Sequence, residues 1–120
     1  MRASFKFFRV NSRNIASIAI VSVDVVESNQ YRIVWQEKAL SLKKIYGDAV
    51  LKGINAAIEQ HTMLGGGIVC ISVVEIIEFY ADTSSDSVMC ASALATWKAL
   101  GYGEESTKIV YENGWTVTFT

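Results

Sequence analysis

The 120-residue sequence contains no proline and a single histidine, His61. Without proline, glycine and clusters of Asn, Asp and Ser must separate the helices and strands. The two cysteines, Cys70 and Cys90, lie in apolar stretches with no ligand residue close by, so we expect two buried thiols and no metal site. A lone histidine without an orienting partner also gives no basis for acid–base catalysis. We therefore expect no enzyme activity and no cofactor.

Long apolar runs and a strong net charge are missing too. Charged side chains interrupt every apolar run well short of a membrane span, and basic residues interrupt the first segment, so we expect a cytoplasmic protein without membrane contact. The net charge is −1, but it is unevenly distributed. Residues 1–60 carry nine basic and five acidic side chains, and residues 61–120 carry two and seven. Such a difference is typical of solvated surfaces and does not by itself indicate nucleic-acid binding.

Apolar residues, in contrast, are abundant. They make up 51% of the sequence, which is enough to build one core without disulfides. We expect a single domain that spans residues 1–120.

Three segments of the N-terminal half show the period-two alternation of strands. They cover residues 4–10, 15–27 and 31–36 and are separated by polar turn clusters. In the third segment Tyr31 and Trp35 share a face opposite to Arg32. Because the three segments follow one another directly, we expect them to pair as a meander.

The spacing of apolar residues then changes to that of helices. Residues 48–63 predict a helix that Asp48 caps and that the glycines at 65–67 end. Residues 68–80 predict an apolar strand at the centre of a sheet, and the cluster 82–86 opens a second helix.

The last segment alternates around Asn113 and Gly114, which predicts a hairpin with a two-residue turn. The whole order predicts an α+β fold, in which a four- to six-stranded, mostly antiparallel sheet has two helices on one face.

Several residues have both a functional and a structural interpretation. At the end of its helix, His61 is expected to contact the last backbone carbonyls. The glycines at 65–67 close a helix and lead into a strand, so they do not form a phosphate-binding loop. Six aromatic residues form either a base-stacking platform, part of the core or an oligomer contact. They are Tyr31, Trp35, Trp97, Tyr102, Tyr111 and Trp115.

Residues 31–102 resemble the fourth domain of elongation factor G, a module of the ribosomal protein S5 domain 2-like fold. Three short motifs carry the resemblance, in matching order and at matching distances. They are YGDAVLKGI at 46–54, LGGGIV at 64–69 and SSD at 84–86, which are similar to the family's first helix, its helix-to-strand turn and the start of its second helix. The resemblance implies two helices on one face of the sheet and a left-handed crossover.

In that family the domain belongs to a large GTPase, and its tip loops reach the ribosomal decoding site. This chain has no nucleotide-binding motif, lacks the histidine of the family's tip, and has residues 36–44 in place of a glycine-rich segment before the helix. The resemblance implies binding to structured RNA or the ribosome, with Ser84 and Ser85 at matching tip positions. Lys43 and Lys44 are independent candidates for contact with phosphate.

The alternative is a protein-interaction or homo-oligomerisation module with no nucleic-acid role. The C-terminal hairpin is a plausible sheet edge, and edge strands pair readily with other chains. Both hypotheses place function in binding and neither requires catalysis.

Overall fold

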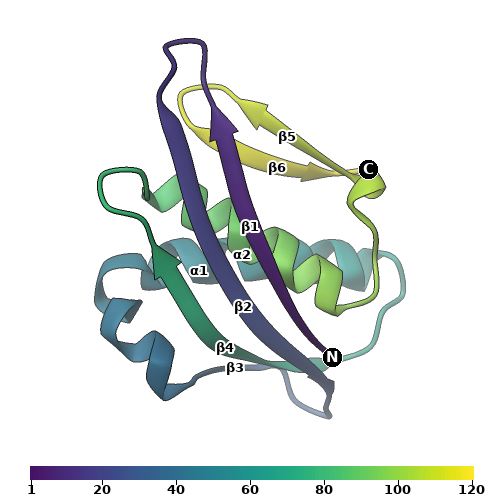
Figure 1. Cartoon of the computed structure of the whole chain (residues 1–120). Coiled ribbons are helices and arrows are strands. Elements are labelled where there is room, and N and C mark those ends of the chain that lie inside the picture. Colours follow the sequence, from purple (N-terminus) through teal and green to yellow (C-terminus); the bar gives the residue numbers. More distant parts are fainter.

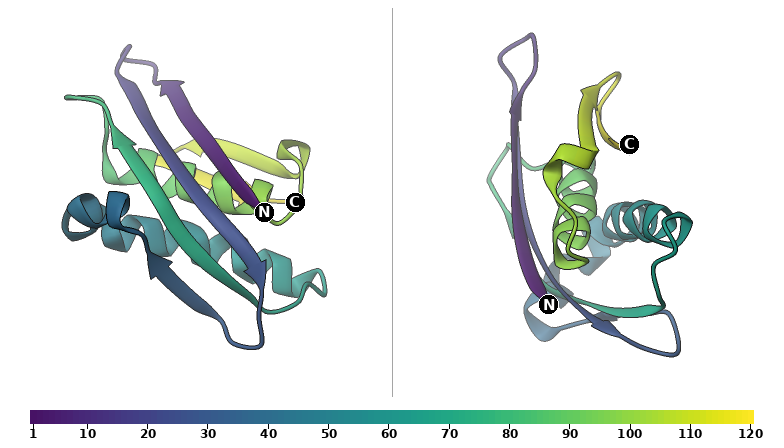
Figure 2. Two further views of the ribbon diagram at one scale, coloured as in Figure 1. Left: turned by 60° about the horizontal axis from the view of Figure 1, so that its bottom comes forward. Right: turned by 90° about the vertical axis from the view of Figure 1, so that its right-hand side faces the viewer.

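A computed structural model describes residues 1–120. Its elements are β1 (Arg2–Val10), β2 (Ala16–Glu27), β3 (Arg32–Trp35), α1 (Glu37–Met63), β4 (Val69–Glu78), α2 (Ser85–Ala99), η1 (Glu104–Ser106), β5 (Thr107–Tyr111) and β6 (Trp115–Phe119). One sheet has the strand order β1-β2-β4-β3, and β5 and β6 form a second sheet. Both helices lie on the same face of the larger sheet (Figure 1, Figure 2). The predicted α+β class is confirmed.

The order of strands in the larger sheet differs from the expected meander. β2 pairs antiparallel with both β1 and β4, whereas β3 pairs parallel with β4 at the far edge. The expectation of a meander was wrong because β4 lies between β2 and β3. The central position suits the apolar run of β4, since both of its edges are hydrogen-bonded there and its helix-side residues are buried. The short β3 remains as an edge strand.

Helix α1 is longer than predicted. It begins at Glu37 rather than Asp48, so Asp48 lies inside the helix and caps nothing. Ala39, Leu42 and Tyr46 extend the apolar spacing of the helix towards its N-terminus, and no proline stops it. Figure 1 shows that these first turns run at an angle to the rest of α1. Neither helix has a stretch that is both long and apolar enough to cross a membrane.

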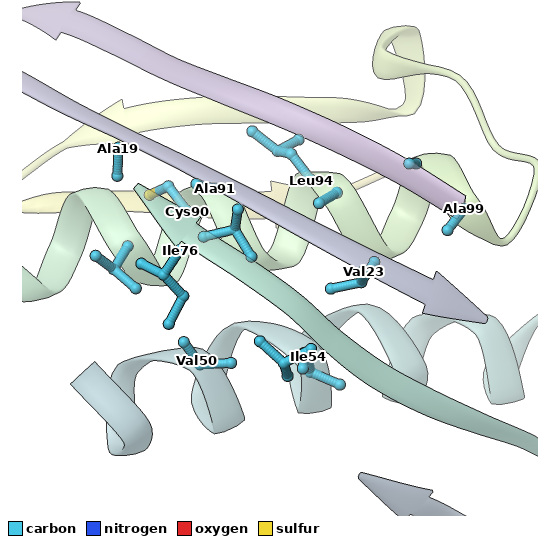
Figure 3. Packing of buried hydrophobic residues seen from close by; sticks show 14 of the residues in the cluster. Ala19, Val23, Val50, Ile54, Ile76, Cys90, Ala91, Leu94 and Ala99 are labelled. Atoms are coloured by element: carbon cyan, nitrogen blue, oxygen red, sulfur yellow. The ribbon is translucent and has the colours of Figure 1, made fainter. Parts of the chain in front are cut away.

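Helix α2 is enclosed on several sides. It packs against β1, β2, α1 and β6, and most of its residues are buried. Side chains of β2, β4 and both helices meet in the core, among them Val23, Ile54, Ile76 and Leu94 (Figure 3). Because it is surrounded, α2 has apolar or small residues all round instead of a single apolar stripe. Cys90 on α2 is buried as expected, but Cys70 on β4 is only half-buried.

The C-terminal hairpin docks on α2 and does not join the larger sheet. Tyr111 pairs with Trp115, which leaves three residues in the turn, so the predicted two-residue turn was wrong. The extra residue is accommodated because the Glu112 backbone N–H donates a hydrogen bond to the Gly114 carbonyl oxygen (2.9 Å). Asn113 and Gly114 both have positive φ, as an Asn-Gly turn favours.

Candidate nucleic-acid interface

Two loops lie at the same end of the larger sheet (Figure 1). They are the β1–β2 turn, residues 11–15, and the β4–α2 loop, residues 79–84, and together we call them the tip. The Ile18 backbone N–H donates to the Asp82 carbonyl oxygen (2.9 Å), and the Thr83 hydroxyl donates to the Ile18 carbonyl oxygen (2.6 Å). These bonds hold the β4–α2 loop against the start of β2.

Each tip loop has an internal restraint. In the β1–β2 turn, the Asn11 side-chain oxygen accepts hydrogen bonds from the backbone N–H groups of Arg13 (2.9 Å) and Ile15 (3.1 Å). In the β4–α2 loop, Ala81 has a φ of +66°, a conformation that a residue with a Cβ adopts only when its surroundings impose it. The backbone of both tip loops is therefore held in a defined conformation.

The tip exposes the Tyr80 ring and Arg13 to solvent, and Lys6 and Arg9 of β1 are exposed as well. Tyr80 is 99% exposed, the highest exposure of any large apolar or aromatic side chain in the protein. The ammonium of Lys6 lies 5.8 Å from the centre of the neighbouring Phe79 ring, and Arg9 and Arg13 lie at or beside the β1–β2 turn. Ion pairs in the protein join only Asp24 to Met1 and Arg2. No carboxylate therefore neutralises Lys6, Arg9 or Arg13, although the Arg9 guanidinium donates a hydrogen bond to the Phe8 carbonyl oxygen (2.9 Å).

Ser84 and Ser85 occupy different environments although they are adjacent. Ser84 caps α2: its hydroxyl bonds to the Asp86 carboxylate, and its backbone N–H donates to the Ser87 hydroxyl (2.9 Å). Ser85 is exposed. The hydroxyl of Ser84 is thus committed within the protein, whereas that of Ser85 is free to contact a ligand.

Lys43 and Lys44 both lie inside α1, although the sequence placed them in a segment before the helix. Both are exposed, and the Lys43 ammonium sits 5.5 Å from the centre of the Trp35 ring. Neither lysine lines the groove that contains Ser85. The four predicted contact residues therefore do not form one cluster.

That groove, of about 460 Å³, separates α1 from the start of α2 and the hairpin turn. Its charged residues are Asp48, Lys52, Asp86 and Glu112. The Asp86 carboxylate already accepts a hydrogen bond from the Trp115 backbone N–H (2.8 Å). This bond links the hairpin to α2. With three carboxylates and one lysine, the groove is a poor phosphate site.

His61 has a structural role at the end of α1. The contact predicted with the last carbonyls of α1 is wrong: Nδ1 bonds to the Tyr102 hydroxyl (2.8 Å), and Nε2 bonds to the Gly67 carbonyl oxygen (3.0 Å). The ring is buried because the segment after α2 folds back over it. With both nitrogens engaged, His61 links the helix to two later segments.

Three groups have a perturbed pKa, and each reflects packing. Burial raises the pKa of Cys90 to about 12; the Asp86 carboxylate adds to this rise and Arg9 opposes it. Burial, followed by the hydrogen bond to Glu78 (2.9 Å) and its charge, raises the pKa of Tyr46. The pKa of Tyr31 is raised by burial alone. No group of three or more His, Cys, Asp and Glu side chains is placed to hold a metal ion.

The predicted aromatic residues do not form one exposed stacking platform. Trp97 and Trp115 are buried, and the Trp97 ring stacks on Tyr102 at 3.9 Å between centres. Both tryptophans pack around α2 and the hairpin and not on the open face of the larger sheet. Core packing accounts for them.

Comparison with known proteins supports the fold of this chain. No known family model and no curated protein matches the chain. Among solved structures, a protein from Thermus thermophilus superposes on 81% of this chain with a TM-score of 0.68 and 18% sequence identity. The matched region is 15% of that longer chain. At this identity the likeness shows a shared fold, which in the Thermus protein is a small part of the whole.

The sequence did not single out Tyr80, the exposed aromatic residue of the tip. The strand predicted over residues 68–80 ends at Tyr80 and includes it. The structure ends β4 at Glu78 and turns the chain at Ala81. An aromatic residue directly before a run of turn-forming Asp, Thr and Ser was the available signal.

Proposed function

We propose that this chain is a non-enzymatic module that binds structured RNA, free or in the ribosome, and that it has the fold of the fourth domain of elongation factor G. The observation that carries the proposal is the exposed Tyr80 ring of the tip, together with three exposed cations of β1 and its turn, Lys6, Arg9 and Arg13, none of which forms an ion pair. Proteins recognise RNA loops by stacking unpaired bases on aromatic rings and by contacting phosphates with Arg and Lys. The match to a small part of a long Thermus chain is in keeping with such a module.

The residues predicted from the sequence have a place in this proposal. Ser85 contributes a free hydroxyl at the start of α2, and Ser84 holds the loop in shape through its capping bonds. Lys43 and Lys44 supply a second, separate contact with phosphate from α1. An RNA that touches both regions has to reach two different helices, which favours a folded RNA over a short single strand.

We expect Tyr80→Ala to weaken binding to a stem–loop RNA by roughly 5- to 150-fold, the loss of about 1–3 kcal/mol for one stacked base. The side chain is exposed, so the fold is retained. Arg13→Ala is expected to reduce the slope of log affinity against log salt by about one. Filter binding across a salt series measures both effects.

Lys108→Ala is the matched control, because Lys108 is exposed on β5, in the second sheet. It should bind RNA like the parent protein. Absence of binding at low salt, or equal binding by the Tyr80→Ala protein, would remove the RNA proposal.

A second candidate function is self-association through the hairpin. β5 and β6 form a two-stranded sheet of their own, so each strand has one edge without a partner strand. Free edges favour pairing with a second chain. We expect light scattering to show a dimer whose population grows with concentration and falls in Thr118→Lys, since an edge lysine opposes strand pairing. A monomer at every concentration removes this candidate.

A further inference from the structure

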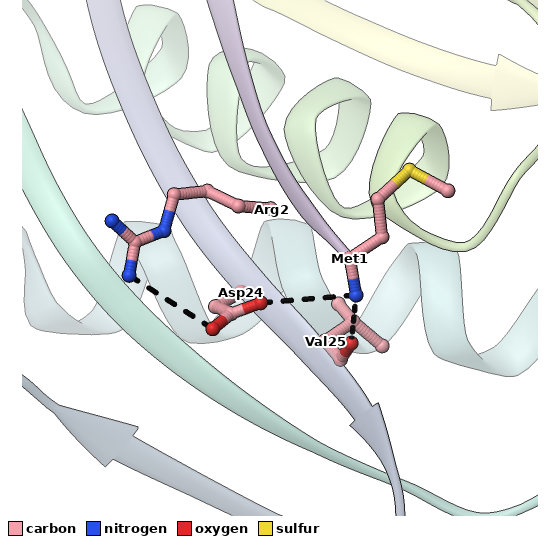
Figure 4. Close-up of polar contacts among 4 residues, drawn as sticks. All are labelled: Met1, Arg2, Asp24 and Val25. Atoms are coloured by element: carbon pink, nitrogen blue, oxygen red, sulfur yellow. Dashed lines mark hydrogen bonds and ion pairs between the residues drawn. The ribbon is translucent and has the colours of Figure 1, made fainter.

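The outer edge of β1 is free, and the backbone register shows which groups it presents. Met1 and Val25 exchange both backbone hydrogen bonds, one of them 2.9 Å long, while Asp24 pairs with the Met1 ammonium and with Arg2 (Figure 4). Such doubly bonded pairs recur at every second residue of an antiparallel ladder. The odd-numbered residues of β1 therefore bond to β2, and the even-numbered ones turn their N–H and C=O groups away from it.

Those outward groups lack partners within the protein. They belong to Arg2, Ser4, Lys6 and Phe8, and only the Phe8 carbonyl oxygen is engaged, by the Arg9 guanidinium (2.9 Å). β1 has no neighbour other than β2 in the sheet. The edge of β1 from Arg2 to Phe8 can consequently hydrogen-bond to one further strand.

A cavity opens beneath the middle of this edge. It has a volume of about 240 Å³ and lies between Phe5 of β1, the C-terminal half of α2 and the segment after α2. Its lining residues are Phe5, Leu94, Trp97, Lys98, Tyr102, Gly103 and Glu104. Phe5 points to the helix side of the sheet, so a residue opposite Phe5 on an added strand would direct its side chain into this space.

The positive charge of β1 favours an acidic strand as its partner. Its nine residues include Arg2, Lys6 and Arg9 and no acid, and neither Lys6 nor Arg9 has a carboxylate within ion-pair distance. Lysine on an edge strand discourages pairing with a second copy of the same strand. Acidic side chains opposite Arg2 and Lys6 would instead form favourable cross-strand pairs.

We propose that β1 accepts an extended acidic segment of a partner protein as a fifth strand of the sheet. Backbone bonds to Arg2, Ser4, Lys6 and Phe8 hold the segment, and one leucine or aromatic side chain fills the cavity beneath Phe5. Acidic residues alternate with apolar ones and lie on the open face, next to Arg2 and Lys6. This combination of an edge strand with side-chain pockets is how several peptide-binding domains recognise their ligands. The site is separate from the RNA-binding proposal, although Lys6 contributes to both.

The probe is the blocked peptide Glu-Val-Glu-Leu-Glu-Val-Glu, titrated into the full chain labelled with ¹⁵N. We expect slowed amide exchange at Arg2, Ser4, Lys6 and Phe8 and little change at Ala3, Phe5 and Phe7, whose amides are already bonded to β2. This alternation distinguishes strand addition from general attraction of an acidic peptide. A scrambled Glu-Glu-Val-Leu-Val-Glu-Glu peptide and a version with Lys in place of Glu should bind more weakly.

Two charge reversals give matched variants. Lys6→Glu should weaken peptide binding about tenfold, since it replaces an attractive cross-strand pair by a repulsive one. Lys108→Glu makes the same change of net charge on the separate hairpin and should bind like the parent protein. Phe5 and the cavity are untouched in both variants, so the fold is retained.

Four results would overturn the proposal. One is equal binding of the scrambled peptide, and another is protection that does not alternate along β1. The third is concentration-dependent protection of the edge amides in the protein alone, which would assign the edge to a second copy. If oligouridylate protected the same amides and the peptide did not, the edge would be a phosphate-binding surface. A failure of RNA binding at the tip leaves the peptide result unaffected, because the alternating amides report on the edge alone.

Discussion

Replacing Gly53 with alanine is expected to lower the free energy of unfolding by about 1–3 kcal/mol. In an exposed helix interior the same change stabilises by about 1 kcal/mol, so the sign is reversed here. A Cβ at Gly53 would overlap the Met89 carbonyl oxygen and would lie 2.9 Å from the Ser92 Cβ. These atoms belong to the backbone and to a short side chain, neither of which can rotate away. α1 and α2 would have to separate.

Gly47→Ala is the matched control, because Gly47 lies in the same helix. The nearest atom to its Cβ would be the Lys43 Cγ at 3.6 Å, an ordinary van der Waals distance. This variant should gain roughly 0.5–1 kcal/mol. Urea denaturation of both variants measures the difference. If Gly53→Ala stabilised the protein as much as Gly47→Ala, the close packing of the two helices would be refuted.

Trp97→Ala should cost about 3–5 kcal/mol, the loss that follows removal of a buried aromatic side chain. Trp97 is 2% exposed, stacks on Tyr102 and lies 4.7 Å from the Phe119 ring, measured between centres. It therefore joins α2 to the segment that follows it and to the last strand. We expect thermal unfolding at a much lower temperature and loss of the hairpin's dispersed amide signals.

Trp97→Phe distinguishes the contribution of ring packing to stability from that of the indole N–H hydrogen bonds. The indole N–H donates to the Ser106 hydroxyl (2.8 Å) and to the Gly103 carbonyl oxygen (3.1 Å), and phenylalanine keeps the ring contact without this donor. We expect a loss of about 1–2 kcal/mol for the missing bonds and the smaller ring. Equal losses in the two variants would mean that the hydrogen bonds, and not the packing, dominate at this position.

The sequence predictions were correct where residues close together in the chain decide the structure. They were wrong where contacts between distant residues decide it. The hairpin, the start of α2 within residues 82–86 and the end of α1 at the glycines were predicted because neighbouring residues decide them. The start of α1 was misplaced because residues 37–47 have a weaker apolar pattern, and packing of Tyr46 and Ala39 against the core supports that part of the helix. The turn of the hairpin was wrong by one residue, within the freedom that an Asn-Gly pair allows.

The candidate surfaces depended even more on contacts between distant segments. Tyr80 is exposed because Thr83 and Asp82 bond to Ile18, which lies far earlier in the chain. The edge of β1 is free because β2 and β4 hold the centre of the sheet and β3 pairs at its other end. Neither feature has a local signature in the sequence.

By itself, then, the sequence determined the α+β class, the kinds and most of the limits of its elements, and the capping and turn chemistry that separates them, because these depend on residues within a few positions of one another. Only the tertiary structure decided which strands became edges, which aromatic rings became core and which cations stayed unpaired. Those outcomes depend on the competition among all segments for burial against one core, and this competition cannot be resolved from any one segment alone.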